Sequence, residues 1–147
     1  MHQSPMDVAI ELAEQAAAAG EAPVGAVVVE NGVILAAERN RMRDLRDPTA
    51  HAELLAIREA AQRRGGRLDG CDIYVTLEPC AMCAGAIAHA RLRRVIYAAS
   101  DTKAGAVEHG VRLFENPNTH HHPEVVSGVS ERRAGELLKH FFARLRE

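Results

Sequence analysis

Residues 24–37 read VGAVVVENGVILAA, two apolar runs separated by Asn31-Gly32. The first run is almost continuously β-branched, which predicts a strand that is buried on both faces of a sheet. Asn-Gly favours the positive φ angles of a tight hairpin turn, so the segment from Val33 to Ala37 is expected to return as the antiparallel partner strand. This stretch therefore predicts a β-hairpin near the start of a sheet.

One helix is expected before the hairpin, and helices and strands alternate after it. A helix is expected to begin at Ser4-Pro5-Met6-Asp7 and to end at Gly20. After a polar, Arg-rich loop, the expected elements are a helix over 49–64, a strand over 72–77, a helix over 80–91, a strand over 95–99, a strand near 124–126 and a helix from about 130. This order predicts a single α/β domain over residues 1–147, with a mixed sheet of about five strands covered by helices. A doubly wound nucleotide-binding fold is the alternative, but no Gly-rich phosphate loop follows the first strand.

Composition excludes several classes of protein. The chain has 147 residues, of which 47% are hydrophobic, so an ordered domain is expected. Only 3% of the residues are aromatic, which excludes a base-stacking platform built from aromatic side chains. No stretch approaches the roughly 20 apolar residues of a membrane span, and the N-terminal segment lacks the basic region of a signal peptide. A cytoplasmic protein without membrane association is therefore expected.

The formal net charge of −2 conceals an uneven distribution. Residues 1–38 contain acidic side chains but no Lys or Arg, so all 18 basic residues follow Glu38. Arg greatly outnumbers Lys among them, and the guanidinium group suits planar contacts with phosphates and bases. A solvated, arginine-rich surface would produce the same pattern, so charge alone leaves a nucleic-acid partner open.

Two short segments carry the residues of a metal site. They are His-Ala-Glu at 51–53 and Pro-Cys-Ala-Met-Cys at 79–83, and each lies at the expected start of a helix. Two thiolates and an imidazole suit zinc, and three protein ligands leave one coordination position open, as in catalytic zinc sites. We therefore predict that His51, Cys80 and Cys83 bind zinc, and that Glu53 carries protons for a water at the open position. Residues two apart on a helix face nearly opposite sides, so His51 and Glu53 converge only at a site over the helix tip.

Other thiol and imidazole groups are also candidate ligands. Cys71 follows a turn and enters an expected strand, where a small buried apolar residue is its commoner role. The run His120-His121-His122 lies in a loop, where contact with solvent or substrate is expected. We assign neither of them to a metal site.

The pattern H-x-E followed by P-C-x-x-C is the signature of zinc-dependent base deaminases. Beyond this motif, the sequence resembles the bacterial tRNA-specific adenosine deaminases of the cytidine-deaminase-like superfamily over nearly its whole length. The strongest stretches of the resemblance are residues 22–27, 40–41, 47–53 and 74–86. The assignment within the superfamily depends on residues 101–106 and 141–146, which resemble a substrate loop and the C-terminal helix.

The resemblance implies a three-layer α/β/α fold, a homodimer, and hydrolytic deamination of the wobble adenosine to inosine in a tRNA anticodon stem-loop. It implies one catalytic zinc ion on His51, Cys80 and Cys83, with Glu53 as the proton shuttle. It also implies substrate contacts from Asn40 to the flipped nucleotide, from Ala22, Leu77 and the Ala52 backbone to the base, and from Asp101, Lys103, Arg144 and Arg146 to the flanking nucleotides. Residues 107–122 depart from the family's pattern, so no RNA contact is carried over to them.

Three other functions are compatible with the motifs. A deaminase of a free base or nucleoside, of guanine or cytosine type, would use the same zinc and glutamate. A non-enzymatic, zinc-stabilised RNA-binding module would not need Glu53 and would prefer a fourth metal ligand. A thiol redox protein would not need His51. The arginine-rich C-terminus and residues 101–106 favour the tRNA substrate.

Overall fold

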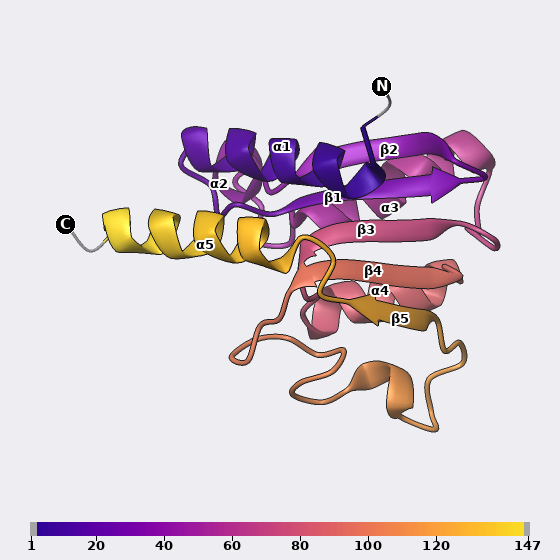
Figure 1. Ribbon diagram of the computed structural model, residues 1–147. Coiled ribbons are helices and arrows are strands. Elements are labelled where there is room, and N and C mark those ends of the chain that lie inside the picture. Colours follow the sequence, from indigo (N-terminus) through magenta and orange to yellow (C-terminus); the bar gives the residue numbers. More distant parts are fainter. Residues whose placement is uncertain (1–2, 146–147) are drawn as a thin grey trace.

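The computed structural model describes residues 3–145 and contains a five-stranded sheet with the strand order β2-β1-β3-β4-β5 (Figure 1). The strands are β1 (Gly25–Glu30), β2 (Val33–Arg39), β3 (Asp72–Leu77), β4 (Arg94–Ala99) and β5 (Glu124–Ser127). β1 is antiparallel to both β2 and β3, whereas β3, β4 and β5 are parallel to one another. The expected mixed sheet of five strands is confirmed, and its antiparallel half differs from the parallel sheet of the doubly wound alternative.

Helices cover both faces of the sheet. The helices are α1 (Pro5–Ala18), α2 (Met42–Leu45), α3 (Ala52–Arg64), α4 (Ala81–Ala90) and α5 (Glu131–Leu145), with a short 3₁₀ turn, η1 (Leu113–Glu115). One apolar core lies between the sheet and α3 and α4, and a second lies between the sheet and α1 and the start of α5. In Figure 1, α1 and α5 lie in front of the sheet, and α3 and α4 lie behind it. The three-layer α/β/α arrangement implied by the resemblance is therefore confirmed.

The hairpin forms as its sequence predicts. Asn31 and Gly32 adopt φ angles of 49° and 78°, and Glu30 pairs directly with Val33 across the turn. Alternate side chains of β1 enter the two cores, Val28 on the side of α3 and α4 and Val27 on the side of α1. A strand between two helical layers needs apolar side chains at every position, which explains the uninterrupted run.

At Gly25, α1 packs directly against the backbone of β1. A Cβ atom at Gly25 would lie 2.0 Å from the carbonyl oxygen of Ala9 in α1. Glycine at this position therefore lets the first helix pack directly on the strand.

The Arg-rich segment after β2, expected as a loop, contains α2. The carboxylate of Glu21, which is buried, accepts hydrogen bonds from the backbone N–H groups of Arg43 and Asp44. These donors lie at the start of α2, so a residue 22 positions earlier in the chain stabilises this short helix. Four residues show no helical periodicity, which is why the sequence pattern did not reveal α2.

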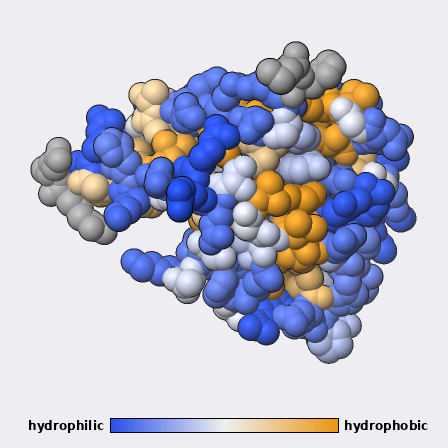
Figure 2. Space-filling view, in the orientation of Figure 1, coloured by the Kyte–Doolittle hydropathy of each residue, from blue (hydrophilic) through white to orange (hydrophobic). Residues whose placement is uncertain are grey.

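The outer surface of α1 and α5 is largely hydrophilic, and Figure 2 shows an apolar area in the middle of the same face. α5 extends beyond the edge of the sheet in Figure 1, and its Phe142 and Leu145 side chains are exposed. Among residues 3–145, no helix is both long and apolar enough to cross a membrane.

Candidate metal centre

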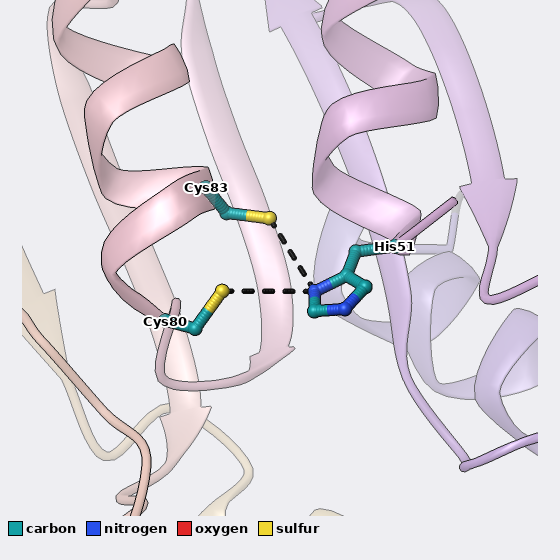
Figure 3. A group of neighbouring side chains, drawn as sticks. All are labelled: His51, Cys80 and Cys83. Atoms are coloured by element: carbon teal, nitrogen blue, oxygen red, sulfur yellow. Dashed lines mark hydrogen bonds between the residues drawn. The ribbon is translucent and has the colours of Figure 1, made fainter. Parts of the chain in front are cut away.

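The N-termini of α3 and α4 meet behind the sheet, and each begins with an unusual N-cap residue. His51 is the N-cap of α3 and Cys80 is the N-cap of α4, both with extended backbone angles. N-cap side chains usually accept a hydrogen bond from the first turn, but neither of these does so. Their side chains point instead toward each other, together with Cys83 in the first turn of α4 (Figure 3).

The spacing of the three side chains fits a zinc ion. Nδ1 of His51 lies 3.6 Å from Sγ of Cys80 and 3.6 Å from Sγ of Cys83, and all three atoms lie within 4.8 Å of one another. Zn–N bonds of about 2.0–2.1 Å and Zn–S bonds of about 2.3 Å, at tetrahedral angles, place nitrogen and sulfur about 3.6 Å apart. The donor set and its geometry therefore both suit zinc, and among residues 3–145 three protein ligands supply three of its four tetrahedral positions.

The electrostatics of the cluster also favour a cation. The hydrogen bond from Cys83 and the contact with His51 lower the pKa of Cys80 to about 4, so its sulfur is a thiolate at neutral pH. The hydrogen bond to Cys80 raises the pKa of His51, and the pKa of Cys83 is also raised because its thiol donates to Cys80. A metal ion that binds here replaces the shared protons, so binding releases protons.

Glu53 lies beside this cluster, in the first turn of α3. It is 4% exposed, and within residues 3–145 its buried Oε1 atom has no hydrogen-bond partner. Burial raises the pKa of Glu53 to about 7, and the charges on His51 and Cys80 also act on its carboxyl group. A buried oxygen without a hydrogen-bond partner lowers stability, so a buried carboxyl group at this position indicates a role for Glu53 in the chemistry of the site. His51 precedes the helix as its N-cap, and its charge acts on the Glu53 carboxyl group, as a site over the helix tip requires.

The residues expected around the base lie at the ends of neighbouring elements. Asn40, which is buried, follows β2, and its Oδ1 accepts a hydrogen bond of 2.7 Å from the backbone N–H of Ala52. This bond ties the end of β2 to the N-terminus of α3. Leu77 ends β3, Ala22 precedes β1, and both are partly exposed. Their contact with a base stays a prediction.

The residues expected at the flanking nucleotides lie outside the metal cluster. The Asp101 carboxylate accepts hydrogen bonds from the backbone N–H groups of Lys103 and Ala104, so it stabilises its own turn. The Lys103 and Arg144 side chains are exposed, the latter near the end of α5. Arg146 lies outside the described residues.

The remaining cysteine and the histidine run lie apart from the cluster. Cys71 is buried, as expected, and its sulfur is 3.5 Å from a nitrogen of Arg64. His121 and His122 contact the carbonyl oxygens of Leu92 and Phe114. Across the part of the chain that the structure describes, His51, Cys80 and Cys83 form the only cluster with metal-binding geometry.

One residue beside the cluster was missed from the sequence. Glu78 lies between β3 and Pro79, and its buried carboxylate accepts hydrogen bonds from residues 101–109. An acidic residue that directly follows an apolar strand was the available signal, but nothing in the sequence shows its partners.

Comparisons with known proteins agree on one family. The model of the cytidine and deoxycytidylate deaminase zinc-binding region matches residues 1–99. A tRNA-specific adenosine deaminase of Agrobacterium fabrum is 51% identical over 138 residues, which cover 93% of this chain and 91% of that protein. A solved structure from a study of tRNA deaminases that edit A to I at the wobble position is 50% identical, has a TM-score of 0.90 and covers 91% of this chain and 98% of its own. The guanine deaminase of Bacillus subtilis is 35% identical, has a TM-score of 0.66 and covers 100% of this chain and 95% of its own.

Proposed function

Because the chain belongs to the tRNA-specific adenosine deaminases, within the zinc-dependent cytidine and deoxycytidylate deaminase family, we propose that it converts the wobble adenosine of a tRNA anticodon to inosine and releases ammonia. The observation that carries the deamination chemistry is the buried carboxyl oxygen of Glu53, which has no hydrogen-bond partner within residues 3–145 and lies beside a three-ligand metal centre. The tRNA substrate is supported by the high identity to tRNA-specific adenosine deaminases over most of the chain. A structural zinc site would close with a fourth protein ligand and would not need this acid.

The proposed mechanism assigns a role to each residue of the centre. His51, Cys80 and Cys83 would hold the zinc ion, which would supply an activated water for attack on C6 of the adenine ring. Glu53 accepts one proton from that water and delivers it to N1 of the ring. It then takes the remaining proton from the hydroxyl group formed at C6 and passes it to the departing amino group, which leaves a carbonyl at C6. A C–O bond forms at C6, the C–N bond breaks, and the nitrogen leaves as ammonia.

The substrate contacts follow the family resemblance. Asn40, Ala22, Leu77 and Ala52 surround the flipped base, and Asp101, Lys103, Arg144 and Arg146 contact the flanking nucleotides. Nearly all of the chain aligns with relatives named for a tRNA substrate, which supports these contacts. The proposal includes a homodimer in the cytoplasm, and sedimentation analysis of the purified protein tests the dimer.

A guanine deaminase is the second candidate, since a protein of that name is 35% identical and covers this chain completely. A substrate panel separates the two functions: ammonia release is measured from an anticodon stem-loop, guanine, cytosine, cytidine and adenosine. We expect the stem-loop to have the highest kcat/KM by orders of magnitude. A higher kcat/KM for guanine would replace the proposed function with the second candidate.

We predict that Arg144→Ala weakens binding of the anticodon stem-loop and flattens its salt dependence. Each lost phosphate contact reduces the slope of log affinity against log salt by about 0.7–0.9. Binding is measured by fluorescence anisotropy at several salt concentrations. Arg63→Ala is the matched control, because Arg63 is also exposed but lies at the far end of α3 and pairs with Glu59. An unchanged slope in Arg144→Ala would assign Arg144 to the solvated surface.

A further inference from the structure

The carboxylate of Glu78 accepts hydrogen bonds from both ends of one loop, residues 101–109. Its side chain is 0% exposed. Oε1 accepts a hydrogen bond of 3.0 Å from the backbone N–H of Asp101 and lies 2.7 Å from Nδ1 of His109. Oε2 accepts bonds of 3.1, 2.9 and 3.1 Å from the backbone N–H groups of Val107, Glu108 and His109. Four backbone donors and one imidazole therefore surround one buried side chain.

The segment 101–109, which we call the anchored loop, forms no helix or strand of its own. Buried backbone N–H groups need acceptors, and here Glu78 supplies what a sheet or helix supplies elsewhere. Both ends of the anchored loop are bound to the same carboxylate, so its path depends on that one side chain. The anchored loop carries Asp101 and Lys103, two of the four residues proposed above to contact the flanking nucleotides.

Backbone contacts join the anchored loop to the metal-ligand segment as well. The N–H of Ala106 donates to the carbonyl oxygen of Pro79 at 2.9 Å, and Gly105 forms an antiparallel bridge with Cys80. A Cβ atom at position 105 would lie 2.4 Å from the carbonyl oxygen of Asp101 and 2.6 Å from Cδ of Glu78. Glycine at this position is therefore required for the carboxylate to reach the loop.

We propose that Glu78 is a positioning residue, which fixes the anchored loop beside the metal centre and so holds Lys103 in place for the RNA. Glu78 directly precedes Pro79-Cys80, so the same short segment places a metal ligand and orders a substrate loop. The inference rests on the proposed function for its RNA partner, but the ordering of the loop is a property of the protein alone.

Two readouts test this role in the zinc-loaded protein. In Glu78→Ala, hydrogen–deuterium exchange in residues 101–109 should rise at least about tenfold, because the backbone donors lose a buried acceptor. The KM for an anticodon stem-loop should rise about tenfold while kcat changes less than about threefold, since binding rather than the chemical step is affected. Zinc content should stay at the wild-type level. Glu78→Gln, which keeps one acceptor oxygen, should give intermediate exchange and an intermediate KM.

Two further variants separate positioning from general loss of stability. Gly105→Ala should loosen the anchored loop as Glu78→Ala does, because its Cβ displaces the carboxylate. Asp72→Asn is the matched control: Asp72 is a largely buried carboxylate at the other end of β3, paired with Arg93, and its loss should leave exchange in residues 101–109 unchanged.

Three results would overturn the proposal: wild-type exchange of residues 101–109 in folded Glu78→Ala, a fall in kcat with unchanged KM, or loss of zinc in that variant. Because exchange is measured without substrate, it tests the loop even if the wild-type protein forms no inosine. Failure of the proposed function and failure of this inference are therefore distinguishable.

Discussion

Glu53→Ala is expected to keep its zinc and to form no detectable inosine from an anticodon stem-loop. Loss of a positioned acid–base group typically lowers the rate by about 10²–10⁴-fold. We expect at least the upper end of this range, because one carboxyl group serves several proton transfers in the proposed mechanism. Glu53→Gln, which keeps the shape of the side chain, should lose as much activity, since the amide cannot carry the proton.

Glu53→Ala is also expected to fold normally. Within the described part of the wild-type chain, the Oε1 atom of Glu53 is buried without a hydrogen-bond partner, so its removal relieves an unfavourable burial. Thermal unfolding of Glu53→Ala should therefore occur at or above the wild-type temperature. Glu21 gives the contrast, because its buried carboxylate accepts bonds from Arg43 and Asp44, and Glu21→Gln should unfold at a lower temperature. Inosine formation within tenfold of wild type in Glu53→Ala would remove Glu53 from its catalytic role.

Cys83→Ser and Cys80→Ser are each expected to bind zinc much more weakly than the wild-type protein. A serine hydroxyl is a hard and neutral donor, whereas zinc in this set is held by thiolates. Changes in the surroundings of zinc ligands already lower metal affinity about 10–100-fold, so loss of a ligand should lower it by at least about 100-fold. Zinc per protein, measured by elemental analysis after dialysis against a chelator, should fall from about one to a small fraction.

Cys71→Ser is the matched control for the loss of a thiol. Cys71 is also buried, but it lies outside the cluster, beside Arg64. We expect this variant to keep full zinc occupancy even if its stability falls. Full occupancy in Cys83→Ser or Cys80→Ser would instead exclude that cysteine as a ligand.

The sequence predicted the elements whose signal is local. The first strand of the hairpin, its turn and the strand over 72–77 were predictable because each depends on residues that are close together in the sequence. The structure contains the strands, and the turn at Asn31-Gly32 has the expected positive φ angles. The cluster of His51, Cys80 and Cys83 was predictable because each ligand lies at a helix start, where residue spacing limits the geometry.

Features that depend on distant partners were not predictable in this way. The short helix α2 exists because Glu21 caps it from 22 residues away, and four residues carry no periodic signal. The role of Glu78 depends on donors 23–31 residues later in a loop without regular structure. The helix expected over 49–64 begins only at Ala52, because His51 is its N-cap residue and has an extended backbone.

The central claim is deamination of a wobble adenosine, and sequencing of tRNA tests it most directly. Bulk tRNA is incubated with the zinc-loaded wild-type protein or with Glu53→Ala and then reverse-transcribed, because inosine is read as guanosine. The account predicts adenosine-to-guanosine changes at the wobble position of an anticodon with the wild-type protein and none with Glu53→Ala. Unchanged wobble adenosines with the zinc-loaded wild-type protein would contradict it.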